Sequence, residues 1–288
     1  MMKQIYIFVL FTFILVSCAK EQPQVSWLKI DKWDLIHNPN ADNYQGELSH
    51  DLSQVFVNMD GKSLGVFELP AKIPIIGEGT HDFVLIPGII NNGIGETKKR
   101  YPFAEQYKHP ITLVLNDTVS ITPTTKYFSS LKFLIEDFES PSIQVDVSAE
   151  STATIGRNDD PSILKWGSKY GEILLNEENS SISFVTTFGT VLPKLATEVY
   201  LEFDYLNTNS LLTSVISHGN GNYFVDPYIL VQAQQENKAH WKHIYIDLKE
   251  IISYRQTTPI NEVQFELKLD DIDASNFFYI DNIKLIYP

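Results

Sequence analysis

Alternation of apolar and polar residues with a period of two is the feature that most constrains this fold. From residue 25 onward, no 12-residue window repeats apolar residues at the helical spacing of i, i+3, i+4 and i+7. Successive side chains of a strand point to opposite faces, so an alternating segment with one apolar face belongs to one sheet of a sandwich. The chain is therefore expected to be all-β. The clearest case is the strand predicted at 198–206, whose two faces carry Val199, Leu201, Phe203 and Tyr205, and Tyr200, Glu202 and Asp204.

Length and composition predict two β domains. The chain has 288 residues, of which 43% are hydrophobic and 20% are charged, and domains usually hold about 100–200 residues. A polar stretch at 124–130 offers little to pack, so the boundary is expected near residue 130. We expect a small Ig-like or PEGA-like β-sandwich over 25–128 and a jelly-roll β-sandwich over 131–288. Strands of the second domain are predicted at 132–138, 181–187, 198–206, 211–217, 228–232, 243–248, 262–268 and 277–286.

The amino terminus has the pattern of a lipoprotein leader. Lys3 precedes an apolar run at 5–16, which is shorter than the roughly 20 residues that cross a bilayer. The run leads into Leu-Val-Ser-Cys ending at Cys18, which resembles the lipobox of bacterial lipoproteins and implies that the Cys18 thiol is acylated. We expect a signal peptide at 1–17, a lipidated cysteine and tether at 18–24, and attachment to the outer membrane through acyl chains. The alternative is a chance cysteine in an ordinary leader.

Composition excludes several kinds of site and partner. Cys18 is the only cysteine, so the folded part has no disulfide, thiol nucleophile or thiolate metal site. The net charge of −14 becomes −15 when Lys3 leaves with the leader. This excludes nucleic acid as a partner, because Lys and Arg supply that affinity. Lys20-Glu21 resembles the start of lipoproteins exported to the cell surface in Bacteroidota, and a generic linker on a periplasm-facing lipoprotein is the alternative.

The first domain resembles the PEGA-type β module of bacterial envelope proteins. The resemblance rests on a strand with an Asx-Gly turn, a second Gly, a Pro, an apolar strand and a Gly-x-His sequence, within 55–70, 72–74 and 79–84. The residues at 67–69 are inserted relative to that pattern. In this reading Asp-Gly at 60–61 forms a type I′ hairpin, since both residues must take positive φ. The segment 87–103 resembles one in uncharacterised Bacteroidota lipoproteins, which implies no activity.

The second domain resembles the galactose-binding-like jelly roll of carbohydrate-binding modules. The resemblance rests on three segments in order at the carboxyl terminus, 241–248, 263–267 and 277–285. It implies a β-sandwich fold, and a fold by itself does not confer sugar binding. A sugar site needs an aromatic face that stacks on a pyranose, with polar neighbours for the hydroxyl groups.

Trp166 and Tyr170 are the predicted ligand-binding residues. Both lie in a Gly-flanked loop, 165–171, where their rings are not part of either face of a strand. The alternative is that the rings fold back over the end of the sandwich, because large rings are rarely left in water.

Two charged clusters are further candidates. Lys98, Lys99 and Arg100 form the only triple-basic run, which would dock an acidic partner or lipopolysaccharide, or would form a solvated turn. A structural calcium ion is chemically possible, because carboxylates are hard oxygen ligands. The alternative that we favour is a solvated turn with the last carboxylate at a strand end, and no other cofactor is expected. The calcium ligands would be Asp270, Asp271, Asp273 and Asp281.

No enzyme motif stands out. The sequence has no Walker loop and no His-Glu-x-x-His. We expect a non-enzymatic outer-membrane lipoprotein that acts as a binding or assembly module at the cell envelope, for instance in a surface secretion or nutrient-uptake complex. The alternative is a glycan-binding accessory protein, or a glycoside hydrolase that uses a carboxylate pair of the jelly roll.

Overall fold

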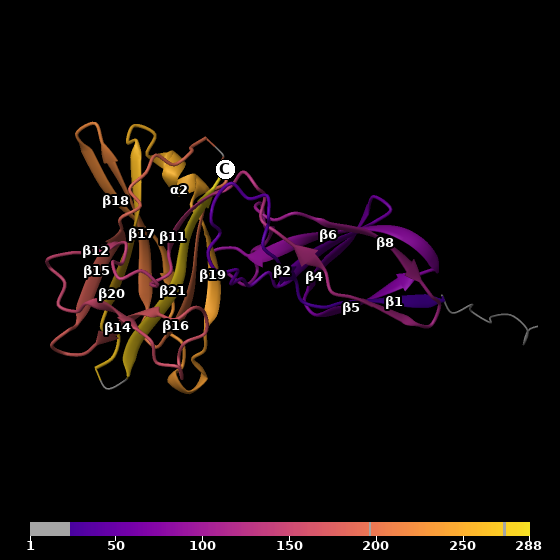
Figure 1. The fold of residues 1–288 in the computed structure, drawn as a ribbon, viewed down its shortest axis with the longest axis horizontal. Coiled ribbons are helices and arrows are strands. Elements are labelled where there is room, and N and C mark those ends of the chain that lie inside the picture. The colour runs from indigo at the N-terminus through magenta and orange to yellow at the C-terminus, as the bar shows by residue number, and fades with distance from the viewer. Residues whose placement is uncertain (1–23, 196, 273–274) are drawn as a thin grey trace, which may run out of the picture.

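The computed structural model describes residues 24–195, 197–272 and 275–288, so the predicted leader, Cys18 and Asp273 lie outside the described residues. The chain forms two β domains placed end to end along its long axis (Figure 1). The sheets made of β1–β10 share no strand with the sheets made of β11–β21 in the described part of the chain. The expectation of an all-β chain is confirmed: its helical elements within the described residues are the turn η1 (Glu236–Lys238) and α2 (Lys249–Tyr254).

The first domain packs its sheets around one apolar core. A three-stranded sheet has the order β5-β1-β9, a second sheet has the order β4-β3-β6-β7 with β8 also on β6, and β10 pairs with β2. Asp60 and Gly61, at φ 50° and 75°, form the predicted hairpin between β3 and β4. The strands are β1 (Val25–Ile30), β2 (Asp34–Leu35), β3 (Gln54–Met59), β4 (Lys62–Glu68), β5 (Ala71–Ile76), β6 (Gly79–Ile90), β7 (Lys98–Arg100), β8 (Tyr107–Leu113), β9 (Thr118–Ile121) and β10 (Thr124–Thr125).

The second domain is a β-sandwich of two antiparallel sheets. One has the order β13-β14-β21-β16-β19, with β11 also on β21, and the other has the order β12-β15-β20-β17-β18. All eight predicted strands are present, and β12–β14 were not predicted. The strands are β11 (Lys132–Glu136), β12 (Val145–Val147), β13 (Ile155–Asn158), β14 (Tyr170–Leu175), β15 (Ser181–Thr186), β16 (Tyr200–Asn207), β17 (Leu211–Gly219), β18 (Asn222–Val231), β19 (Lys242–Asp247), β20 (Ile260–Lys268) and β21 (Asn276–Tyr287).

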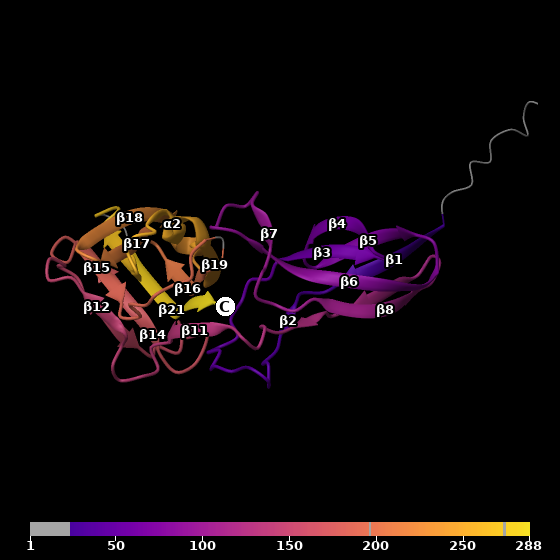
Figure 2. The same cartoon turned by 90° about the horizontal axis from the view of Figure 1, so that it is seen from above.

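The polar face of β16 lies at the junction of the two domains. Tyr200, Glu202 and Asp204 are all buried, because the first domain and the segment at 37–53 cover this face of the sheet (Figure 2). Tyr200 and Tyr245 of the second domain belong to the same apolar cluster as the core of the first domain. The two domains are therefore joined by a continuous packed interface. Rings that meet there are Tyr101, Phe103, Tyr127, Phe133, Tyr200 and Tyr245.

Candidate functional site

A gap in one edge of the β21 ladder creates the floor of a pocket. β14 pairs with β21 as far as Ile280, and β11 pairs with it from Ile283 onward. Asp281 and Asn282 lie between these two pairings and have no strand partner on that edge among the described residues. The chain leaves β11, makes a long excursion and returns at β14, so the excursion's two ends meet beside the gap.

The pocket at this gap has a volume of about 290 Å³. Asp281 and Asn282 line it from β21, and the chain after β11 adds Asp137 and Glu139. The loop before β14 adds 166–168, and Tyr44 and Glu47 come from the segment of the first domain that crosses the second. The site is therefore built by both domains. Two aromatic rings, carboxylates and one amide line the same pocket, which we name the Trp166 pocket.

Glu139 holds the loop that carries Trp166. One carboxylate oxygen accepts the N–H groups of Ser168 and Lys169 at 2.6 and 3.0 Å, and the other accepts the Ser168 hydroxyl. Partial burial raises the pKa of Glu139, but these hydrogen bonds outweigh it and lower that pKa overall. Gly167 has φ 52°, and a Cβ there would collide with the Glu139 carboxylate. The left-handed backbone favours glycine at this position, and a Cβ would have to displace the end of the Glu139 side chain.

Trp166 and Tyr170 have different environments. The Trp166 ring is half-buried, meets the Trp241 ring edge-on at 5.5 Å, and has the Lys165 ammonium 4.3 Å from its centroid. Tyr170 is the first residue of β14 and is 1% exposed, against Trp241 and Tyr279. The prediction that neither strand face claims Tyr170 is therefore wrong, because β14 begins at this residue. Trp166 lines the pocket, and Tyr44, 69% exposed, is the second ring there, which was missed.

The pocket floor can both donate and accept hydrogen bonds. Burial, with smaller contributions from Asp204, Asp137 and Glu139, raises the pKa of Asp281 to about 9, so this carboxyl group is protonated at neutral pH. The Asn282 side chain donates to Asp204 Oδ2 at 3.1 Å, while its buried Oδ1 has no partner among the described residues. A buried acceptor without a partner costs free energy, and a ligand hydroxyl group would satisfy it.

A buried charged cluster lies at the domain interface, on the face of the β16–β19–β21 sheet that points away from the core of the sandwich. His243 Nδ1 is 2.9 Å from Asp204 Oδ1, and its Nε2 is 3.5 Å from Glu202 Oε2. Burial alone lowers the pKa of His243, but the two carboxylates outweigh it and raise that pKa to about 9. Tyr101 of the first domain donates its hydroxyl to Glu202, and Lys284 Nζ donates to the Glu47 carbonyl. The cluster thus ties β16, β19 and β21 to the first domain.

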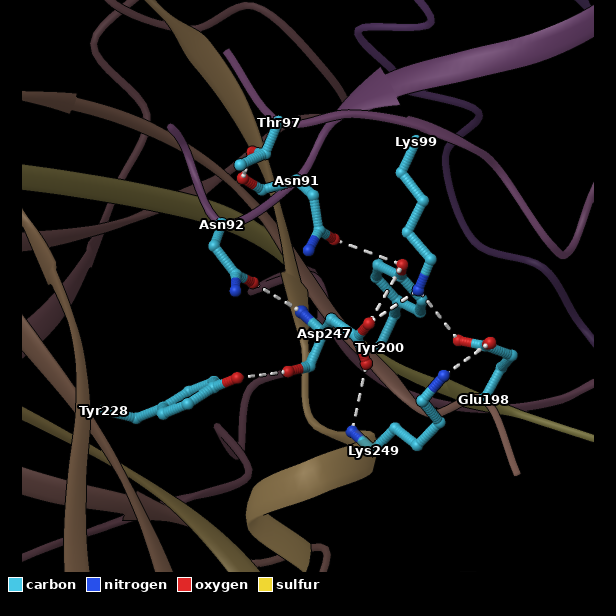
Figure 3. A network of polar contacts seen from close by, with 9 residues as sticks. All are labelled: Asn91, Asn92, Thr97, Lys99, Glu198, Tyr200, Tyr228, Asp247 and Lys249. Carbon is cyan, nitrogen blue, oxygen red and sulfur yellow. Dashed lines mark hydrogen bonds and ion pairs between the residues drawn. The ribbon is translucent and has the colours of Figure 1, made fainter. Parts of the chain in front are cut away.

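The predicted basic docking run forms β7 and faces the second domain. Lys99 Nζ lies 2.6 Å from Asp247 and 3.1 Å from Glu198 (Figure 3). For Lys99, the expected external acidic partner is therefore replaced by carboxylates of the same chain. Arg100 has its guanidinium 5.3 Å from the Phe56 ring centroid. Lys98 is exposed.

The predicted calcium ligands do not converge. Asp270 accepts the Ser210 N–H at 2.6 Å. The Asp271 carbonyl accepts the side-chain amide of Asn276, which is the first residue of β21. Asp281 lies five residues into β21, about 16 Å along an extended strand. These residues therefore cannot share one ion. Within the described residues there is no group of three or more His, Cys, Asp or Glu side chains placed to hold a metal, and no helix there is long and apolar enough to span a membrane.

The comparisons with known proteins give no family. No family model matches the chain, and no curated protein matches its sequence. Among solved structures, it is similar to carbohydrate-binding modules with jelly-roll β-sandwich folds. One, from work on promiscuous specificity in the β-sandwich superfamily, is 12% identical over 81% of this chain and 84% of its own, with a TM-score of 0.39.

Two further structures show a similar degree of likeness. The family 11 module from Clostridium thermocellum, in complex with a β-1,3-1,4-mixed-linked tetrasaccharide, is 16% identical over 54% of this chain and 94% of its own, with a TM-score of 0.35. The enzymatically active domain of bacteriophage CBA120 tailspike protein 4 is 16% identical over 52% of this chain, with a TM-score of 0.38, and this chain covers 20% of it. All these TM-scores lie below 0.5, so the matches indicate neither a ligand nor an activity for this chain.

Proposed function

We propose that the protein is a membrane-anchored, non-enzymatic binding module whose Trp166 pocket takes a neutral glycan. The observation that carries the proposal is the pocket itself, in which Trp166 and Tyr44 accompany groups that pair with hydroxyl groups. Aromatic rings with a few placed polar groups are the usual composition of a small-ligand site. The unpartnered Oδ1 of Asn282 and the protonated Asp281 supply one acceptor and one donor at its floor.

In this proposal Cys18 anchors the protein to the membrane, and the fold would place the Trp166 pocket far from that anchor. β1 starts at the end of the first domain that points away from the second domain (Figure 1). An acylated Cys18, a few residues before β1, would put the first domain next to the membrane as a spacer. The second domain would then face outward. Cys18→Ser should release the protein from the membrane fraction or leave the leader uncut, and normal processing with membrane retention would contradict the anchor.

The test of the pocket is binding of neutral oligosaccharides to the soluble domains. A panel that includes β-1,4-galactotriose and a β-1,3-1,4-linked tetrasaccharide should contain a ligand, measured by calorimetry. Trp166→Ala should weaken that binding by at least ~1 kcal/mol, about sixfold, because ring stacking is lost. Tyr254→Ala is the control and should leave the affinity unchanged, because this exposed ring on α2 does not line the Trp166 pocket.

Two outcomes would contradict the glycan pocket. If a folded Trp166→Ala protein keeps full affinity, the ligand binds elsewhere. If the variant loses stability and the parent binds nothing in the panel, Trp166 is a packing residue that folds back on the sandwich.

A glycoside hydrolase is the second candidate, and one observation favours it. Hydrolysis needs a protonated carboxylic acid near an ionised carboxylate, and Asp281 lines the same pocket as Asp137 and Glu139. Against it, Asp281 is 2% exposed and Glu139 already accepts hydrogen bonds from Ser168 and Lys169. Robust turnover of an oligosaccharide that Asp281→Asn abolishes would overturn the non-enzymatic reading.

A further inference from the structure

A second pocket opens at the end of the sandwich, where the first domain again contributes. It has a volume of about 460 Å³ and lies between the end of β18, the loop at 232–241 and β19. Asn92 and Gly93, at the tip of the loop after β6, close one side. None of these residues lines the Trp166 pocket, so the two sites are separate. We name this site the Lys238 pocket.

The charge of the Lys238 pocket is unusual for this chain. The chain has 36 acidic residues against 22 basic ones, yet the described residues that line this pocket include Lys238, His240 and Lys242 and no Asp or Glu. Other lysines, such as Lys99, lie in ion pairs with carboxylates. Among the ion pairs formed within the described residues, none includes Lys238 or Lys242. Two cationic groups are therefore left to face the pocket.

The pocket walls are held in place before any ligand arrives. The Gln234 amide donates to the Asn207 side chain at 3.1 Å and to the His240 carbonyl at 2.9 Å, which closes the loop on itself. On the other side, Asn92 N–H donates to the Tyr245 carbonyl at 2.8 Å, and Asn92 Oδ1 accepts the Asp247 N–H at 2.8 Å (Figure 3). A site fixed in this way loses little entropy on binding.

The remaining lining suits a sugar more than a bare anion. Tyr205 lies directly opposite Lys242 in the β16–β19 ladder, so both side chains are on one face of the sheet. The Tyr205 ring stacks on Phe278, and burial raises the pKa of its hydroxyl to about 12, so the hydroxyl stays a donor. Gln232 and Gln235 add amides at the rim, and Leu230 adds an apolar surface.

We propose that the Lys238 pocket binds the carboxylate-bearing unit of an acidic glycan, with Lys238 and Lys242 facing the carboxylate and the amides facing the hydroxyl groups. This inference rests on the proposed function in one respect, that the ligand is a saccharide. It assigns a second site with a different charge preference, because Glu47, Asp137 and Glu139 line the Trp166 pocket beside Asp281, and their carboxylates would repel an acidic sugar.

The experiment compares charged and neutral forms of the same glycan by calorimetry. The probes are trigalacturonate and trimannuronate, each beside its carboxyl-reduced trisaccharide. At least one uronate should bind, more weakly as NaCl rises from 50 to 500 mM, and at least tenfold more tightly than its reduced form. Lys238→Gln with Lys242→Gln should weaken uronate binding at least tenfold. The control, Lys62→Gln with Lys108→Gln, changes the net charge equally at exposed positions of the first domain and should have no such effect.

The outcomes separate this site from the proposed function. Unchanged uronate binding in the double variant, equal binding of the reduced trisaccharides, equal competition by sodium acetate at the same concentration, or no binding at millimolar concentration would each overturn the acidic-glycan site. If Trp166→Ala instead abolishes uronate binding, the ligand lies in the Trp166 pocket, which overturns this inference and leaves the proposed function standing. Unchanged uronate binding in Trp166→Ala, together with loss in the double lysine variant, supports it.

Discussion

Gly167 decides where the Trp166 ring lies. Its positive φ turns the loop so that the next two N–H groups point at the Glu139 carboxylate. A Cβ at this position would have to displace the Glu139 carboxylate and so disturb the hydrogen bonds that hold the loop. The aromatic side of the pocket thus depends on one glycine and one glutamate that are far apart in the sequence.

Gly167→Ala should therefore destabilise the loop by about 1–3 kcal/mol, which is the range for a residue forced into a strained conformation. Thermal unfolding should show the loss, and glycan affinity should fall with it because the ring moves. Gly156→Ala is the matched control, since Gly156 in β13 has open space around its Cβ position and an ordinary φ. Equal melting temperatures for the two variants would contradict this account of the loop.

At the scale of elements, β7 is the strand that fastens the two domains at their rim. It pairs with β6 in the first domain, and Lys99 reaches across to the chain before β16 and to the end of β19. Asp247 also accepts the Lys249 N–H, and Lys249 Nζ pairs with Glu198 (Figure 3). The ion pairs form a connected network rather than isolated surface pairs, which contribute little.

Lys99→Met should lower the free energy of unfolding by about 1–2 kcal/mol, because two half-buried carboxylates lose a charged partner. Urea unfolding followed by tryptophan fluorescence measures the change. The neighbouring Lys98→Met is the control: Lys98 is exposed and forms no ion pair within the described residues, so its substitution should cost less than about 0.5 kcal/mol. A Lys99→Met protein as stable as Lys98→Met would show that the network does not hold the domains.

At the scale of the whole molecule, the domains share one buried interface and should unfold together. Apolar residues of both domains form a single cluster, and the charges of His243, Glu202 and Asp204 lie buried on the outer face of the same sheet. Burial of paired charges ties the stability of the interface to pH. Inter-domain motion is the usual expectation for small polar interfaces, and an interface of this kind favours one rigid rod.

The pH dependence follows from the pKa of His243, which is about 9 in the folded chain and 6.5 ordinarily. A group whose folded pKa is raised contributes stability fully below its unfolded pKa and loses it as pH rises through the folded value. Stability should therefore fall between pH 6.5 and pH 9, and Asp281, whose folded pKa is also raised to about 9, adds to this fall. Urea unfolding at pH 6, 7.5 and 9.5, followed by circular dichroism, tests this.

His243→Gln should reduce that pH dependence to the part that Asp281 contributes and cost about 3–5 kcal/mol, because two buried carboxylates lose their partner. The exposed His109→Gln is the control and should leave both stability and pH profile nearly unchanged. A parent protein whose stability is level from pH 6 to 9.5 would show that His243 is not charged in the fold.

The sequence by itself determined the all-β class and most strands of the second domain, because period-two alternation reports which face of a strand is buried. The Asp-Gly turn at 60–61 was also predictable, since the positive φ values that it needs are a local property of the chain. The sequence did not predict β12 and β13, because segments of three and four residues are too short to show a period of two. β14 is not among the predicted strands because the loop predicted at 165–171 covers its first two residues.

Only the tertiary structure decided which polar residues meet. The sequence predicts that Glu202 and Asp204 lie on the polar face of a strand. That face is buried because the segment around Glu47, more than 150 residues earlier, crosses it. The Trp166 pocket likewise needs the gap between β11 and β14 on β21 and the arrival of Tyr44. Alternation is a local signal that a chain carries within a few residues. Pairing across domains is set by packing, and no short window of the sequence records it.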